Sequence, residues 1–246
     1  MVSALSIIGV LLLALFVVSY KTVPLAYPVR FYFQVIRSLG ASKFFTKQDA
    51  TKHNTWGFRD GRDLFKFVDL KSSCSLLELD FYLHKSNSTF FFDLDIARTK
   101  LLTQVFQQFW WYAFENRDGK MGKGQPYAVA NFPYTPVAAV QCQFKRELKL
   151  FEKFTIKSRV LAWDQKWLFI LSVFTTKDRK NKEKVNAYAL TKYVFKNGRQ
   201  TIPPPDILKH CNLLDEKSEA INKVNYELVR TMVETENLEA LVTTAI

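Results

Sequence analysis

The stretch Asp80–Arg98, which reads DFYLHKSNSTFFFDLDIAR, decides the fold because a polar turn passes directly into an apolar, periodic run. From Thr89 to Asn116, apolar residues recur mostly at spacings of three and four, which predicts one long α-helix. Large apolar groups stand on every side of this helix. Such a pattern is typical of a helix that is buried on more than one face.

On both sides of the helix the apolar residues alternate instead. Residues 64–74 precede it and are predicted to form a strand, and residues 117–125 follow it as a loop. Alternation then predicts five strands, at residues 127–131, 136–150, 154–164, 167–176 and 185–196. Short connections make these strands antiparallel. This order predicts an α+β hot-dog fold, in which an antiparallel sheet wraps a long central helix. A helix leaning on an open sheet is the alternative.

The N-terminus is strongly apolar. Residues 2–20 carry no charge over nineteen positions. As a helix this run would span about 28 Å, close to one hydrocarbon core. It lacks the basic start and the small-residue cleavage site of a signal peptide, so a retained transmembrane anchor is expected at residues 1–20. Basic residues after it predict a domain facing the cytosol. The endoplasmic reticulum is the favoured membrane, and the outer mitochondrial membrane is the alternative.

The remaining chain divides by composition. A basic juxtamembrane linker is expected at residues 21–62, the hot-dog domain at residues 63–200, and a helical extension at residues 201–246. The chain has 35 Lys and Arg against 23 Asp and Glu, and the excess is largest in residues 142–200. Such a surface suits phosphates or anionic lipids, or is simply a set of solvated strand faces. No zinc finger, RNA-binding signature or basic helix accompanies it, so nucleic acid is not an expected partner.

The few Cys and His residues limit the chemistry. Three Cys and three His are scattered along the chain without a CxxC pair. A disulfide framework, a metal site and a cofactor are therefore not expected.

Polar residues gather where the long helix begins: Asp80, His84, Ser86, Asn87, Asp93 and Asp95. The free N–H groups of a first helical turn can polarise a carbonyl or hold an oxyanion. A carboxylate beside them could activate water or attack directly. Together these are the parts needed to hydrolyse an activated acyl group. The same residues could instead serve only as helix caps, dipole partners or salt-bridge partners.

The quoted stretch resembles the D-x-x-G-H-x-N-N-x-x-Y motif of hot-dog acyl-CoA thioesterases, followed by a similar acidic-x-acidic-x-Ala-Arg run. The likeness extends to residues 146–154 and 160–164. It is strongest to the membrane-anchored member-six subgroup of the thioesterase superfamily. Three positions depart from the motif: Leu83 replaces Gly, Ser86 replaces the first Asn, and Phe90 replaces Tyr.

The resemblance implies roles for individual residues. Asp80 falls on the catalytic carboxylate, and Asp93 on an acidic position that some members use in catalysis. The expected substrate-binding residues are Leu83, His84, Ser86, Asn87, Ser88 and Phe90. His84 and Asn87 would shape the turn, while Leu83 and Ser86 would supply backbone N–H groups near the acyl carbonyl.

Three functions are therefore weighed. The first is a membrane-anchored, homodimeric thioesterase that hydrolyses fatty acyl-CoA or another acyl lipid, with the CoA phosphates on the basic strands. The second is a hot-dog protein with a blunted site, which binds acyl lipids or a protein partner at the membrane. The third is a hydratase, which would need a His–carboxylate pair with His84 as its imidazole.

Overall fold

The computed structural model describes residues 3–40 and 49–234. Parts of the predicted anchor, linker and extension, at residues 1–2, 41–48 and 235–246, lie outside the described residues. One five-stranded antiparallel sheet has the order β1-β3-β4-β5-β2. Its strands are β1 (Val68–Ser73), β2 (Val137–Phe144), β3 (Lys153–Trp163), β4 (Leu168–Lys177) and β5 (Glu183–Tyr193). The hot-dog fold predicted from the sequence is confirmed in its sheet and its central helix.

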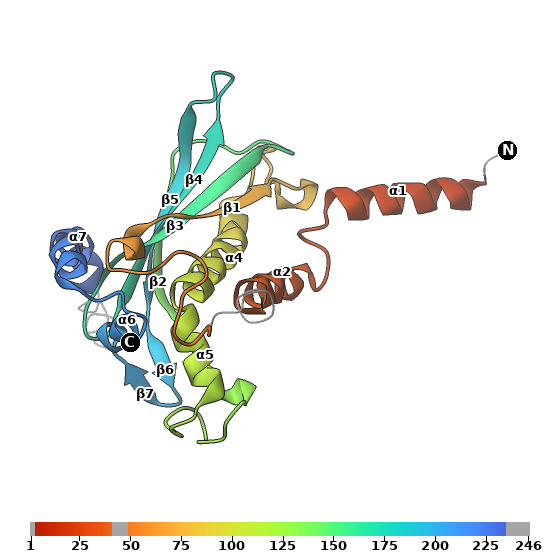
Figure 1. Cartoon of the computed structure of the whole chain (residues 1–246). Coiled ribbons are helices and arrows are strands. Elements are labelled where there is room, and N and C mark those ends of the chain that lie inside the picture. Colours follow the sequence, from red (N-terminus) through yellow and green to blue (C-terminus); the bar gives the residue numbers. More distant parts are fainter. Residues whose placement is uncertain (1–2, 41–48, 235–246) are drawn as a thin grey trace, which may run out of the picture.

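The central helix lies across the sheet in two pieces, α4 (Asn87–Val105) and α5 (Gln107–Glu115), as Figure 1 shows. A single helix was predicted, but the backbone leaves helical geometry at Phe106. The side-chain amide of Asn54 donates to the carbonyl of Gln104 at 2.7 Å and to that of Val105 at 3.2 Å. The Asn54 side chain, from a distant loop, therefore binds two carbonyl groups that would otherwise accept from N–H groups of the next helical turn.

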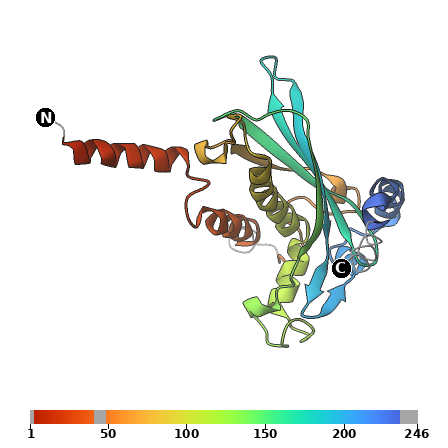
Figure 2. The same ribbon diagram turned by 180° about the vertical axis from the view of Figure 1, so that it is seen from behind.

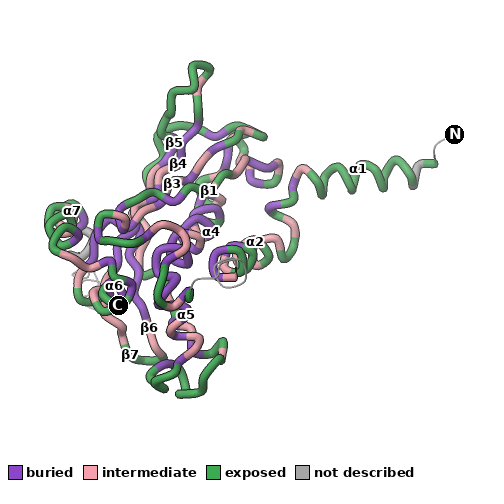
Figure 3. Tube along the Cα trace, in the orientation of Figure 1, coloured by how far each residue is buried: buried purple, intermediate pink, exposed green. Residues whose placement is uncertain are grey.

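The core forms between this helix and the sheet. Leu94 and Ala97 of α4 pack with Phe154, Ile156 and Phe174 of the sheet, and all five are buried. A second cluster surrounds α5 and the far ends of the strands. Figure 3 shows this burial along the inner side of the sheet, while the outer loops are exposed. The two-sided burial predicted for the long helix is explained by what covers its other side.

That cover is the N-terminal segment. Helix α2 (Ala26–Val35) and the short π-helix η1 (Ile36–Gly40) pack against α4 on the side away from the sheet. Figures 1 and 2 show α4 lying between α2 and the sheet. The segment predicted as a linker thus contributes a helical layer to the domain.

The prediction of a membrane anchor is wrong. Helix α1 (Ala4–Val18) has 15 residues, because the chain turns at Ser19 instead of continuing to residue 20. At 1.5 Å per residue such a helix is about 22 Å long, against a hydrocarbon core of about 30 Å. Within the described ranges, no helix combines the length and the hydrophobicity that crossing a membrane requires. The predictions of a membrane partner and of a cytosol-facing position at the endoplasmic reticulum followed from that anchor and are withdrawn with it.

The C-terminal part adds a small hairpin and two helices. Strands β6 (Phe195–Asn197) and β7 (Gln200–Ile202) form the hairpin, followed by α6 (Pro204–His210) and α7 (Glu216–Glu234). Helix α7 packs against β3. The strand predicted at residues 127–131 is instead an irregular segment ending in a 3₁₀ turn, η4 (Val129–Asn131).

Candidate active site

The turn before α4 is built by the side chain of Asp80. Its Oδ1 accepts hydrogen bonds from the backbone N–H of Tyr82 at 2.9 Å and of His84 at 3.4 Å. Two backbone bonds between Asp80 and the end of the turn close it. Leu83, which stands where the motif has Gly, adopts the left-handed conformation with φ of 60° and points its side chain outward. The backbone shape that favours Gly is thus kept despite the side chain.

This turn lines a pocket of about 460 Å³ at the start of α4. Four of the predicted site residues meet there: Asp80, His84, Asn87 and Phe90. Phe90 is buried and packs edge-to-face on Phe144 of β2, so it forms the apolar floor. Asp80 Oδ2 has no partner among the described residues, and it is the oxygen left available at the pocket.

The first turn of α4 begins at this pocket, which Asn87 lines. Ser86 occupies the N-cap position but makes no capping bond with its side chain, because its hydroxyl lies 3.0 Å from that of Ser88. In the described part of the chain, the backbone N–H groups of Asn87 and Ser88 have no acceptor. They are available to a carbonyl or an oxyanion. Leu83 and Ser88 are exposed and do not line the pocket.

His84 has a partner that the sequence did not reveal. Its Nε2 contacts the carboxylate of Glu147, in the loop between β2 and β3. The backbone brings the two together, since Lys85 N–H donates to the carbonyl of Leu148 at 2.8 Å. Glu147 lies in the segment 146–154, whose likeness to the thioesterases was the one available signal. The pair gives the pocket an imidazole held by a carboxylate.

Asp93 lies outside this pocket, in a cluster of five charged side chains that we call the buried ion cluster. Its Oδ2 lies 2.8 Å from Lys21 Nζ and 3.0 Å from Lys85 Nζ, and its Oδ1 lies 2.6 Å from Arg30 Nη2. Glu78 binds the same two lysines, at 2.9 Å from Lys21 and 2.5 Å from Lys85. Three cations therefore face two carboxylates, and all but the partly exposed Arg30 are buried.

The charges around Asp93 fix its ionisation. Burial by itself raises the pKa of this carboxyl, but Lys21, Lys85 and Arg30 outweigh it and hold the pKa at about 2. Asp93 is fully buried and paired on both oxygens. Lys85 belongs both to the cluster and to the pocket lining, so the cluster supports the turn that carries Asp80 and His84.

Basic groups stand on the outer rim of the pocket. Lys145 and Arg146 line it where β2 ends. Arg146 donates to the carbonyl of Val185 at 2.8 Å, which fixes its side chain beside β5. Among the described residues, no group of three His, Cys, Asp or Glu side chains could hold a metal ion.

An antiparallel sheet around a central helix, with a carboxylate and free N–H groups where that helix begins, defines a hot-dog protein of the thioesterase class. Residues 74–211 match the Thioesterase-like superfamily, and the chain belongs to this superfamily.

Two curated relatives agree with that membership, and one solved structure shares the fold. The chain is 37% identical to the probable thioesterase YBR096W of Saccharomyces cerevisiae, over 86% of this chain and 83% of the relative. It is 32% identical to the thioesterase poxG of Penicillium oxalicum, over 88% and 73% of the two chains. A mutant acyl-CoA hydrolase of Staphylococcus aureus superposes with a TM-score of 0.50 at 9% identity, over 76% of this chain and 99% of the other. This last likeness concerns the fold alone.

Proposed function

We propose that the protein hydrolyses acyl-CoA thioesters, with Asp80 as the catalytic carboxylate. The observation that carries the proposal is that Asp80, with a free Oδ2, and Asn87, with an unpaired backbone N–H, line one pocket. A general base and an oxyanion site within one pocket are what acyl transfer to water requires. The relatives are named thioesterases, which supports the same reaction.

The reaction follows from these groups. Asp80 accepts a proton from water as the water oxygen attacks the thioester carbonyl. The oxyanion that forms accepts hydrogen bonds from the N–H groups at the start of α4. When the carbon–sulfur bond breaks, the CoA thiolate leaves and takes up a proton, and the acyl group leaves as a carboxylic acid.

The pocket has features that suit the two halves of the substrate. Lys145 and Arg146 lie at the rim, where they can pair with the phosphates of CoA. Phe90 and Phe144 supply an apolar floor beside the reacting carbonyl. His84 and Asn87 also line the pocket, and the fatty acyl group expected from the sequence remains part of this proposal.

Asp80→Asn tests the proposal, because the amide cannot accept a proton from water. Thiol release from a panel of acyl-CoAs is expected to fall by at least about 100-fold, the usual contribution of a general base. Asp206→Asn is the matched control, since Asp206 is an exposed carboxylate on α6. Turnover in Asp80→Asn equal to that of the control would remove Asp80 from the mechanism. No turnover on any acyl-CoA by the folded full chain would favour the blunted, ligand-binding alternative.

The His84–Glu147 pair favours a second candidate reaction. A hydratase of this fold would need an imidazole held by a carboxylate, and this pair occupies the same pocket. Loss of enoyl-CoA absorbance without thiol release would identify hydration. Thiol release that keeps pace with the loss of absorbance would identify hydrolysis, which also removes the conjugated thioester, and would leave Glu147 the role of orienting His84.

A further inference from the structure

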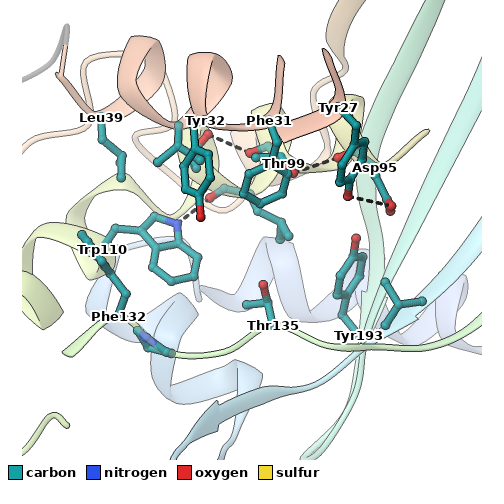
Figure 4. A pocket seen from close by; sticks show the side chains of 15 residues that line it. Tyr27, Phe31, Tyr32, Leu39, Asp95, Thr99, Trp110, Phe132, Thr135 and Tyr193 are labelled. Atoms are coloured by element: carbon teal, nitrogen blue, oxygen red, sulfur yellow. Dashed lines mark hydrogen bonds between the residues drawn. The ribbon is translucent and has the colours of Figure 1, made fainter. Parts of the chain in front are cut away.

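A second pocket, which we call the α2 pocket, lies between α2, the junction of α4 and α5, and the end of β5. Its volume is about 390 Å³, within the range of small-molecule sites. Helix α2 forms one wall and α4 and α5 another, and the end of β5 and the loop before β2 close it, as Figure 4 shows. Helix α2 precedes residues 74–211, so this wall is an addition to the part that matches the superfamily.

The lining of the α2 pocket is largely aromatic. Its rings come from four different elements: Tyr27, Phe31, Tyr32, Trp110, Phe132 and Tyr193. Flat rings on several sides favour a flat, ring-bearing ligand, because aromatic pairs gain from stacked and edge-on contacts. Trp110 is held in place by a hydrogen bond from its Nε1 to the carbonyl of Leu102 at 2.9 Å. This wall is therefore preformed.

One end of the α2 pocket is polar. There the carboxylate of Asp95 accepts from the Tyr27 hydroxyl at 3.3 Å and pairs with Arg98. Arg98 is buried and donates to the hydroxyl of Thr191 at 2.7 Å, so its guanidinium is fixed between helix and sheet. The carboxylate is thereby held at the pocket surface as an acceptor.

Tyr193 stands opposite this carboxylate with a hydroxyl that lacks a partner. Only 5% of the residue is exposed, yet its hydroxyl has no hydrogen bond to any residue that the structure describes. Figure 4 shows the hydroxyl pointing into the pocket toward Asp95. Burial raises the pKa of Tyr193, so the hydroxyl keeps its proton and can donate. An unpaired hydroxyl on a buried residue, aimed into a preformed pocket with an acceptor facing it, is placed to bind a polar group of a ligand.

The α2 pocket and the pocket lined by Asp80, which we call the Asp80 pocket, both lie along α4 and β2. Asn87 and Phe144 line the Asp80 pocket, while Asp95 and Val137 line the α2 pocket. Eight helical residues separate Asn87 from Asp95, which corresponds to about 12 Å along α4. The two pockets thus lie beside opposite ends of β2 and along one helix.

We propose that the α2 pocket binds the far end of the acyl group, and that this end is a ring bearing a hydroxyl. The ring would lie between Phe31 and Trp110, and its hydroxyl would donate to Asp95 and accept from Tyr193. This proposal rests on the proposed function, because it takes the thioester carbonyl to lie at Asp80. It makes helix α2 a determinant of substrate choice.

The test compares two acids that differ by one hydroxyl, 5-(4-hydroxyphenyl)pentanoic acid and 5-phenylpentanoic acid, against the full chain. Binding is followed by tryptophan fluorescence, and Trp110→Phe establishes which part of the signal comes from this pocket. The unsubstituted chain is expected to bind the hydroxylated acid about tenfold more tightly, as one added hydrogen bond implies. Tyr193→Phe keeps the ring and is expected to abolish that preference. Tyr188→Phe, on the exposed part of β5, is expected to preserve it.

The outcomes separate this proposal from the proposed function. Equal binding of the two acids by the unsubstituted chain, or an unchanged preference in Tyr193→Phe, would overturn the α2 pocket proposal. Thiol release from the corresponding CoA esters is measured in parallel. A preference that depends on Tyr193 but comes without thiol release would uphold the pocket and reject hydrolysis.

Discussion

The contribution of the buried Asp93 to the free energy of unfolding depends on the number of charges around it. Its cluster holds three cations and two carboxylates. Asp93→Asn would leave three cations, two of them buried, facing Glu78 alone, and we expect the free energy of unfolding to fall by about 3–5 kcal/mol. Lys21→Met would leave two charges of each sign and is expected to destabilise the protein less. Urea unfolding of both variants measures the difference, and the reverse ranking would contradict this view of the cluster.

The pH dependence of stability follows from the same carboxylate. Its pKa in the folded protein is about 2, below the ordinary value for Asp. The stabilisation is therefore fully present above about pH 4 and is lost as the pH falls toward 2. The Asp93→Asn variant serves here as the reference that lacks this contribution.

The sequence predicted which nearby residues share a site, but it did not predict contacts between residues that are far apart in the chain. Asp80, His84 and Asn87 fall within eight positions, and their motif spacing foretold that they share a pocket. Lys21 lies 72 residues from Asp93. No local pattern marks such a pair, because a buried cation looks like a surface cation in a sequence. The roles predicted for Asp80 and Asp93 in catalysis stay predictions.

At the scale of elements, the alternation of apolar residues located strands β2 to β5, while tertiary hydrogen bonds decided where they end. The end of β3 illustrates this, since it extends past its neighbour β1, whose pairing stops at Ser158. Helix α7 completes the exposed edge there. Asn222 accepts from the N–H of Trp163 at 2.8 Å and donates to its carbonyl at 3.0 Å. The break at Phe106 has a similar origin in Asn54.

Asn222→Ala is expected to loosen this edge, because it removes both partners of the Trp163 backbone. We expect a loss of about 1–3 kcal/mol in the free energy of unfolding and faster hydrogen exchange at the Trp163 amide. Lys223→Ala, one position along the same exposed helix, is the control and is expected to change neither. Exchange at Trp163 that is equal in the two variants would mean that α7 does not protect β3.

At the scale of the whole molecule, β2 leaves one edge of the sheet unpaired. Within the described ranges it pairs only with β5, and Val137 and Phe144 are partly exposed on it. An unpaired strand edge is a template for another strand. We propose that two copies pair β2 with β2, in line with the homodimer expected from the sequence.

Light scattering tests this pairing. The chain of 28.6 kDa is expected to show twice that mass in solution. Gln141 lies near the middle of β2, so Gln141→Lys would place like charges close together across a twofold axis and shift the protein toward the monomer. Gln200→Lys, on the exposed β7 strand, is expected to leave the mass unchanged. A dimer that persists in Gln141→Lys would place the contact elsewhere.

The strand order also has a consequence for the synthesis of the chain on the ribosome. Ser73 of β1 pairs with Lys153 of β3, eighty residues later. Strand β2 likewise gains its partner only after β5 has been synthesised. At about 5–20 residues per second, translation leaves β1 without a neighbour for roughly 4–16 s. Helix α4 is complete during that interval, but the sheet that buries Leu94 and Ala97 is not. The nascent protein therefore exposes an apolar helix that has no sheet to pack against. During this interval the chain is expected to need chaperones most.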